Sequence, residues 1–510
     1  MNISLRTCAF LAICPWLCSG LHSQVQIGYD GNGVSSVNWR GWNFVQGGQP
    51  EVERADFCST PGDPVSGNTP SSSQVDPFSG TITRTFGWGT VISSFAASGD
   101  TLTMSLQVSN TSQLPLCQLV IRALNLRFPQ KPTEDNGGDP MMFHNSGDLS
   151  LLQFSFGSGV VVLANEDVVR PLTAGLPGVD GSSYPLKLST ARNPMYPGSY
   201  PFIDRPIAPG ATDQYTLSLR FGDPGSTSDT LGSDIWDRYR DAHPMVLNWL
   251  DRRPIGDIYV ASLAGRSGTN PRGYFGDTNV DVFSPQGMDD FRQRVRELAR
   301  KSVSVLLGMN AQGMIVWDLE GQQFPDALYI GDPVQIGVFS PEMNAVADEL
   351  FAPVRDAGLR VGVGLRLRQA AFLPDGSVVQ LPLTDDQAVQ HILDGIRYAQ
   401  NRWGATLFYI DSNDYFDADI FRRIATAAPD VLIIPEQENL LHYAYTAPYE
   451  DARNGVRRCT PAKVRKMYPD ALSVINFVDL ATYNQHFAET SKCNDIMQFR
   501  GTFIDGDIAH

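Results

Sequence analysis

Residues 403–413 read Trp403-Gly404-Ala405-Thr406-Leu407-Phe408-Tyr409-Ile410-Asp411-Ser412-Asn413, a short apolar run that stops at a carboxylate. The run lacks the alternation of a half-exposed strand, so we expect both of its faces to be covered, as in a parallel sheet. Amphipathic helix patterns precede and follow it. Asp411 therefore stands where a strand of a β/α protein gives way to its loop, the usual place for catalytic groups. The alternative is a solvated aspartate that caps the next helix, a role open also to Asp417 or Asp419.

Strand and helix patterns alternate on both sides of this stretch. Helices are expected to begin at Ser284-Pro285, Ser340-Pro341, Thr384 and Thr460-Pro461, each a capping residue or a cap followed by proline. The other expected strands are Ile255–Leu263, Gly313–Leu319, Leu359–Leu367, Val431–Ile434, His442–Tyr445, Leu472–Val478 and Ile496–Phe499. Eight such units predict a (β/α)₈ (TIM) barrel over residues 251–510. If His442–Tyr445 is not a strand, the barrel is incomplete near its C-terminal end.

The region before the barrel has a different composition. Residues 24–228 are rich in Gly, Ser, Thr, Pro and Asn and hold short strand-like runs, at Thr81–Phe86, Leu102–Val108, Cys117–Leu124, Gly159–Leu163 and Gln214–Phe221. This pattern predicts a β-sandwich without a catalytic constellation. Residues 229–250 are expected to form a linker helix, centred on Asp234 to Trp249. The fold class is therefore multidomain, a β-sandwich followed by an α/β barrel.

Composition narrows the class of partner. The 510 residues carry a net charge of −16, which argues against nucleic acid or an anionic membrane as the main ligand. Eight tryptophans and 10% aromatic residues suit stacking on sugar rings. Residues 1–23 are typical of a signal peptide, with Arg6 before an apolar segment too short to span a bilayer, and no later stretch predicts a membrane helix. We expect a secreted or periplasmic protein.

Cysteine usage agrees with export. The chain after the signal keeps Cys58, Cys117, Cys459 and Cys493, an even number in two widely separated pairs. Two disulfides, Cys58–Cys117 and Cys459–Cys493, are expected in an oxidising compartment, and four buried free thiols are the alternative. No Cys/His cluster has the spacing of a metal site, and no nucleotide-binding loop occurs, so neither a metal nor a cofactor is predicted.

Polar residues follow the predicted barrel strands at the end that carries the active site in such barrels. Because these ends meet at one face, the residues are expected to lie around a common site. The set is Trp317, Asp318 and Glu320 at the C-terminal end of the second strand, Arg366 and Arg368 at that of the third, Asp411 and Asn413 at that of the fourth, Glu436 and Glu438 at that of the fifth, Tyr443 near the sixth, and Asn476 and Asp479 at the end of the seventh.

Many carboxylates without metal ligands suit glycoside cleavage. One carboxylic acid protonates the leaving oxygen, and a second carboxylate attacks the anomeric carbon or activates water. We expect Asp411 to be the nucleophile or base and Glu436 the general acid, in a mechanism of the retaining type, with Asp479 as a third catalytic carboxylate. Substrate binding is assigned to Trp317, Asp318, Glu320, Arg366, Arg368, Asn413, Glu438 and Tyr443.

These positions resemble two groups of glycoside hydrolases. The α-amylase superfamily has its nucleophilic Asp after strand four, its acid Glu after strand five and a further Asp after strand seven, which match Asp411, Glu436 and Asp479. This chain departs from it in having Tyr409 where that family has an arginine, and in lacking its histidines. The α-galactosidase-like group also places a β-sandwich before the barrel, but its acid follows strand six, where only Tyr445 and Glu450 stand. The resemblance is one of architecture, and fold alone does not give function.

Two functions of different kinds follow from this pattern. The first is an exported hydrolase of a poly- or oligosaccharide. The second is a non-catalytic carbohydrate-binding or cell-surface protein built on a glycosidase-like barrel. A hydrolase requires two facing carboxyl groups roughly 5–9.5 Å apart, whereas a binding protein requires only aromatic faces and hydrogen bonds.

Overall fold

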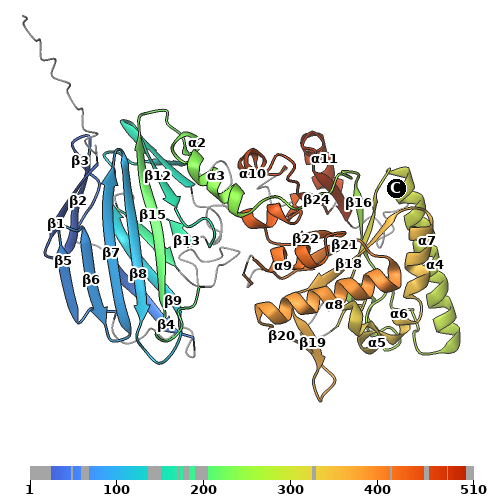
Figure 1. Ribbon diagram of the computed structural model, residues 1–510. Coiled ribbons are helices and arrows are strands. Elements are labelled where there is room, and N and C mark those ends of the chain that lie inside the picture. The colour runs from blue at the N-terminus through green and yellow to red at the C-terminus, as the bar shows by residue number, and fades with distance from the viewer. Residues whose placement is uncertain are drawn as a thin grey trace, which may run out of the picture.

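The computed structural model describes residues 25–500, except for 48–49, 59–67, 136–150, 171–172, 176–182, 190–204, 324–328, 414–415, 418, 453–458 and 479. An all-β part and a barrel follow one another along the chain and are joined by a short helical segment (Figure 1). No helix in these residues is long and apolar enough to cross a bilayer.

The N-terminal part consists of antiparallel sheets. The largest has eight strands in the order β10 (Thr133–Asp135), β11 (Leu151–Phe156), β12 (Gly159–Asn165), β15 (Thr212–Gly222), β8 (Thr101–Asn110), β7 (Gly89–Ser98), β6 (Thr81–Phe86) and β5 (Ser72–Asp76). A second has the order β13 (Thr173–Gly175), β14 (Tyr184–Ser189), β9 (Leu116–Leu126) and β4 (Glu51–Phe57). A third holds β1 (Val25–Asp30), β2 (Gly33–Trp39) and β3 (Trp42–Asn43).

These sheets share one hydrophobic cluster. Strict alternation along β8 buries Leu102, Met104, Leu106 and Val108, and β9 contributes residues such as Ile121 to the same cluster. Period-two burial of this kind is what a sheet with one covered face produces. All five strands that the sequence predicts in this region are present.

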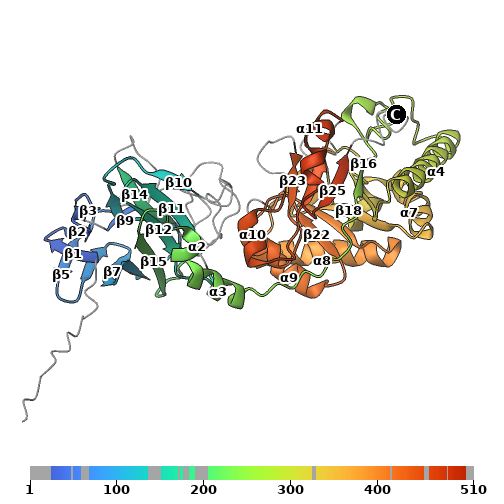
Figure 2. The same cartoon turned by 90° about the horizontal axis from the view of Figure 1, so that it is seen from above.

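The linker differs from the prediction. Helices α2 (Ser228–Leu231) and α3 (Ser233–Ala242) are followed by an extended segment, so the expected helix to Trp249 is wrong. Pro244 explains the early end, because the residue before a proline is disfavoured in the α conformation. His243 is held from both sides at this point: its Nε2 lies 2.8 Å from Val168 O, and Tyr468 donates a hydrogen bond to its carbonyl oxygen. Figure 2 shows the extended segment running from α3 to the first barrel strand.

The C-terminal part is an eight-stranded parallel sheet that is close to a closed barrel. Its strands, in spatial order, are β22 (Leu432–Pro435), β21 (Leu407–Asp411), β18 (Arg360–Arg366), β17 (Gly313–Trp317), β16 (Ile255–Tyr259), β25 (Ile496–Arg500), β24 (Val474–Phe477) and β23 (Tyr449–Asp451). Ala447 N donates to Ile433 O, which links the segment before β23 to β22. The predicted barrel architecture is confirmed at this level.

Helices cover the outside of the strands (Figure 2). They are α4 (Pro285–Gly308), α5 (Ile336–Phe339), α6 (Pro341–Asn344), α7 (Ala347–Asp356), α8 (Asp385–Trp403), α9 (Asp419–Ala427), α10 (Ala462–Met467) and α11 (Leu480–Thr490). The starts expected at Ser284, Ser340 and Thr384 are N-caps whose side chains accept backbone N–H groups. The hairpin β19 (Gln369–Phe372) and β20 (Val378–Leu381) follows β18.

Strand β21 shows why its sequence does not alternate. Phe408 and Ile410 pack outward against the helix layer, while Leu407 and Tyr409 pack inside the barrel, and all four are buried. Gly404 ends the preceding helix α8 in the left-handed region, at φ 67°, which glycine adopts without strain. The strand therefore begins directly after the helix, and Asp411 is its last residue.

The sixth barrel strand is not where the sequence predicts it. Residues Leu440–Ala444 form the 3₁₀ helix η3, begun by Asn439, whose side chain accepts from Leu441 N at 2.8 Å. The predicted strand His442–Tyr445 is therefore wrong. The strand in this place is β23, which begins after Pro448. Its three residues are too few to give a visible sequence pattern.

Cys459 and Cys493 form a disulfide across 34 positions of the chain, as predicted. Cys58 is also disulfide-bonded. The side chain of Cys117 lies outside the described residues, so its pairing with Cys58 stays a prediction.

The double variant Cys459→Ser/Cys493→Ser should be less stable than the parent by roughly 2–4 kcal/mol, because the bond restricts a 34-residue loop in the unfolded chain. Urea denaturation of both proteins measures the difference. Equal midpoints, together with free thiols at both positions in a non-reduced peptide map of the parent, would contradict the bond.

Candidate active site

Polar side chains point into the barrel above an apolar floor. The floor consists of inward residues of the lower strand halves, among them Ile255, Leu407, Leu432, Val474 and Ile496. Side chains two positions further along a strand point to the same side. On this inward side, above the floor, lie apolar Ile434 and then the polar or aromatic residues Asp257, Tyr259, Tyr409, Asp411, Glu436, Asn476 and Gln498. A barrel core is normally filled by branched apolar residues, so a polar upper half marks this end of the barrel as a site.

Asp411 forms an ion pair with Arg366, the last residue of the neighbouring strand β18. The two are register partners, so the pairing of the strands itself brings them together. Their side chains are only 10% and 20% exposed. Arg366 Nη1 also donates to Tyr329 O at 2.7 Å, and its guanidinium lies 5.3 Å from the centre of the Tyr329 ring. Removing one partner of such a half-buried pair leaves the other charge uncompensated.

Ser412 links the acids of two strands. Its hydroxyl donates to Asp411 Oδ2 at 3.1 Å, and its backbone N–H donates to Glu436 Oε2 at 2.9 Å. Arg366 Nε donates to the same hydroxyl at 3.2 Å. Ser412 has φ 62°, a left-handed conformation that costs a residue other than glycine about 1–2 kcal/mol. Backbone strain of this kind concentrates at functional sites.

The loop after β22 is tied to the loop after β21. Asn413 Nδ2 donates to Gln437 O at 3.0 Å, and Gln437 N donates back to Asn413 Oδ1 at 2.7 Å. These reciprocal bonds hold Glu436, which precedes Gln437, beside Asp411. The two carboxylates chosen from the sequence as a catalytic pair thus come from adjacent strands and share one serine.

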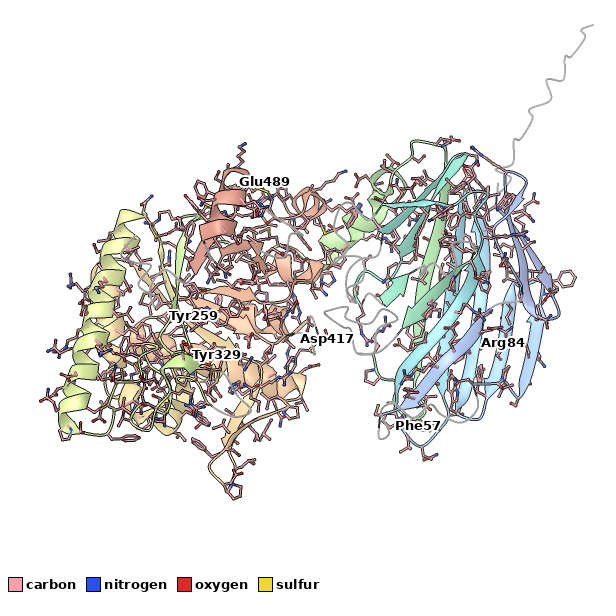
Figure 3. The ribbon with its side chains drawn as sticks, turned by 180° about the vertical axis from the view of Figure 1, so that it is seen from behind. Phe57, Arg84, Tyr259, Tyr329, Asp417 and Glu489 are labelled. Carbon is pink, nitrogen blue, oxygen red and sulfur yellow. A yellow bond between two sulfur atoms is a disulfide. The ribbon has the colours of Figure 1, made fainter. Side chains whose placement is uncertain are left out.

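Aromatic rings gather below and beside these acids. Trp317 lies 4.2 Å from Tyr409, 5.3 Å from Tyr259 and 5.4 Å from Tyr329, measured between ring centres, and Tyr409 lies 5.2 Å from Tyr449. Figure 3 shows Tyr259 and Tyr329 close together in the barrel. A Cβ at Gly364 would collide with the Tyr329 hydroxyl, so this glycine makes room for the ring. Tyr259, Trp317 and Tyr449 stay partly exposed, and Tyr259 and Trp317 stack on each other with 15° between their ring planes.

Two predicted ligand residues are buried under the loop after β17. Asp318, at φ 39°, accepts from Val260 N at 3.1 Å and from Gln322 Nε2 at 2.7 Å, so its oxygens are used to hold the loop. Burial raises the pKa of Glu320 from its ordinary value near 4.5 to about 8, and nearby Asp332 and Asp318 add to the rise. Burial also raises the pKa of Asp332. Glu320 is therefore a neutral carboxylic acid at pH 7.

The structure describes all but one of the remaining predicted residues. Glu438 is buried and accepts from the hydroxyl of Tyr443, itself fully buried in η3, at 2.7 Å. Arg368 follows β18 and is half-buried. Asp479 lies outside the described residues. Asn476 lies inside β24, within the seventh strand that the sequence predicts, and donates to the Tyr449 hydroxyl at 2.7 Å.

Sequence reasoning missed several residues of this site. Asp451 ends β23, faces inward two positions after Tyr449, and is 9% exposed. Asp257 and Gln498 are fully buried in β16 and β25, inside the barrel. Tyr329 comes from the long connection after β17. One sequence pattern could have revealed Asp451. In the segment Pro448-Tyr449-Glu450-Asp451 an aromatic residue stands two positions before an acid, as Tyr409 stands two positions before Asp411.

Metal-type ligands do not gather at this mouth among the residues described. The one group of three potential metal ligands in the described part of the chain is Cys459, Cys493 and Asp495, and its cysteines are joined in the disulfide. The arrangement at the mouth instead offers adjacent carboxylates, one arginine and partly exposed aromatic faces.

No family model and no curated protein matches this chain. Solved structures similar to it include three glycosidases. The GH36 α-galactosidase AgaB from Geobacillus stearothermophilus is 10% identical, with a TM-score of 0.43 over 95% of this chain and 73% of that chain. The α-N-acetylgalactosaminidase NagBb from Bifidobacterium bifidum is 10% identical, with a TM-score of 0.48 over 84% and 77%. The galactosidase domain of the α-galactosidase-sucrose kinase AgaSK is 11% identical, with a TM-score of 0.41 over 92% and 71%. At these TM-scores the similarity carries no conclusion about activity.

Replacing the buried acid by its amide tests the state of Glu320. Because its folded pKa is about 8, the folded protein holds a proton that the unfolded chain loses near pH 4.5, and the parent loses stability as pH rises between these values. Glu320→Gln cannot ionise. Relative to the parent it should gain stability from pH 5 to pH 8, by an amount on the order of a few kcal/mol, and then level off.

Denaturant midpoints at pH 5, 6, 7 and 8 measure this difference. Glu489→Gln is the matched control, because it removes an exposed carboxylate of α11 and should show no such trend. A constant difference between parent and Glu320→Gln over this range would contradict the neutral state of Glu320.

Proposed function

We propose that this protein is an exported glycoside hydrolase that cleaves a poly- or oligosaccharide at the mouth of its barrel. The observation that carries the proposal is the contact of Asp411 and Glu436 with one residue, Ser412, beside partly exposed aromatic rings. Paired carboxylates on adjacent strands are the chemical requirement of glycoside cleavage. The export signal of residues 1–23, and the packing of 24–228 as a β-sandwich without catalytic groups, belong to the same proposal.

Asp411 is proposed as the nucleophile or base. Its ion pair with Arg366 and its place at the end of a fully buried strand fix its position. A retaining mechanism needs two carboxyl groups about 5–5.5 Å apart, and the spacing of about 4.8 Å between adjacent parallel strands supports this mechanism for Asp411 and Glu436. The sugar ring would rest on the faces of Tyr259 and Trp317.

The general acid has two candidates. Glu436 is the one that the sequence indicates, and it is partly exposed. It accepts the Ser412 N–H at 2.9 Å, however, so one of its carboxylate oxygens is already engaged. Asp451 faces the same interior from β23, one strand beyond β22. A variant of Glu436 and a variant of Asp451 decide which of the two residues is the general acid.

The second function, carbohydrate binding without cleavage, is supported by one observation. Arg366 engages Asp411 directly, and an ion-paired carboxylate is a weaker nucleophile than a free one. In that case the aromatic faces and the polar rim of the barrel bind a sugar, and no bond is broken.

Asp411→Asn keeps the shape of the side chain and removes its charge. It should lower turnover by about 10³-fold or more, since the lost interaction acts on the transition state. It should also lower stability, because Arg366 loses the carboxylate with which it pairs. Hydrolysis is measured on a glycan panel that includes α-galactosides and α-glucosides. Wild-type turnover by this variant would exclude the role, and binding without hydrolysis by the parent would favour the second function.

Loss of the general acid has its own signature. The variant that removes it should be slow on substrates with poor leaving groups and nearly as fast as the parent on aryl glycosides whose leaving group needs no proton. Glu436→Gln and Asp451→Asn are compared on both substrate types. If neither variant shows this split, neither residue is the acid.

A further inference from the structure

Ser412 occupies a place in the site that the proposed function does not explain. It neither attacks nor protonates the sugar in that account, yet it bonds Asp411, Glu436 and Arg366. It also keeps a left-handed backbone, with φ 62°, directly after the strand. A glycine would adopt this conformation without strain, so the serine side chain has a reason to be there.

The contacts of Ser412 differ in kind. Its N–H is fixed by the backbone and serves Glu436 on β22, while its hydroxyl serves Asp411 on its own strand. The hydroxyl has one proton, and it accepts from Arg366 Nε while donating to Asp411. Arginine is therefore the donor to serine, serine is the donor to aspartate, and the aspartate oxygen only accepts. The strain at this residue is offset by bonds to three charged groups, which are stronger than bonds to neutral ones.

We propose that Ser412 is a positioning residue that fixes Asp411 and Glu436 relative to each other and keeps Asp411 ready to react. The inference rests on the proposed function. Through its hydroxyl it orients the Asp411 carboxylate. Through its N–H it holds Glu436 at the distance that the pair requires.

Two variants separate the hydroxyl from the backbone. Ser412→Ala loses the hydroxyl and keeps the strained backbone, and Ser412→Gly loses the hydroxyl and relieves the strain, while both keep the N–H. Each should lower kcat about tenfold with little change in KM, the loss expected for one hydrogen bond to a charged group. The acid limb of the profile of kcat/KM against pH should move to higher pH, because a carboxylate with fewer donors takes up its proton more readily.

Ser412→Thr tests the hydroxyl directly. It keeps the donor, so the acid limb should return to the parent position even where the β-branched side chain lowers Tm. Ser377→Ala is the matched control, because it removes a serine hydroxyl that donates to Asp375 at an exposed turn, and it should leave kcat and the pH profile unchanged.

Several results would overturn the proposal. The first is a parent-like pH profile and kcat in both Ser412→Ala and Ser412→Gly. The second is a loss of activity that follows Tm alone, with an unmoved acid limb, which is the mark of a merely structural serine. If the parent hydrolyses no glycan, the proposed function fails, and the inference is then tested by ¹³C carboxylate NMR of labelled Asp and Glu. Identical titration of the Asp411 signal in the parent and Ser412→Ala would overturn it there.

Discussion

The ion pair between Arg366 and Asp411 is the interaction on which the mouth of the barrel depends. Register pairing of β18 with β21 places the two side chains together at the ends of their strands. Glu436 and Asp451 face the same interior, so the site gathers negative charge that one arginine partly offsets. Charges in so enclosed a place interact more strongly than at the surface, and without the arginine the acids would repel one another.

The polar groups around this pair are held by the fold and not by flexible loops alone. Asp411 and Arg366 end strands, Ser412 and Glu436 follow strands directly, and the loops after β21 and β22 are joined by the bonds between Asn413 and Gln437. Below them Trp317, Tyr409 and Tyr329 pack closely in the barrel. A site on rigid elements keeps its geometry before a ligand arrives, which lowers the cost of binding and reaction.

The sequence predicts the barrel well where burial is two-sided. The apolar run 403–413 is recognisable because both faces of β21 are covered, and the N-caps at Ser284 and Thr384 mark their helices. It fails where the pattern is short or a proline intervenes: Pro244 ends α3 early, and β23 has only three residues. The site residues were likewise predictable only where they follow a strand with a clear sequence pattern. Asp411 and Glu436 are found because they follow clear strands, whereas Asp451 belongs to the strand that no pattern reveals, and Tyr329 arrives from a long connection.

The central claim is that a sugar binds at this mouth with its reacting carbon between the carboxylates. A crystal structure of Asp411→Asn with the glycan that the parent binds most tightly tests it most directly. The account predicts a sugar ring on the faces of Tyr259 and Trp317, with its anomeric carbon within about 3–3.5 Å of the side chain at position 411, the distance of a reactive approach. A glycan bound only to the N-terminal sheets, with the mouth of the barrel unoccupied, would contradict it.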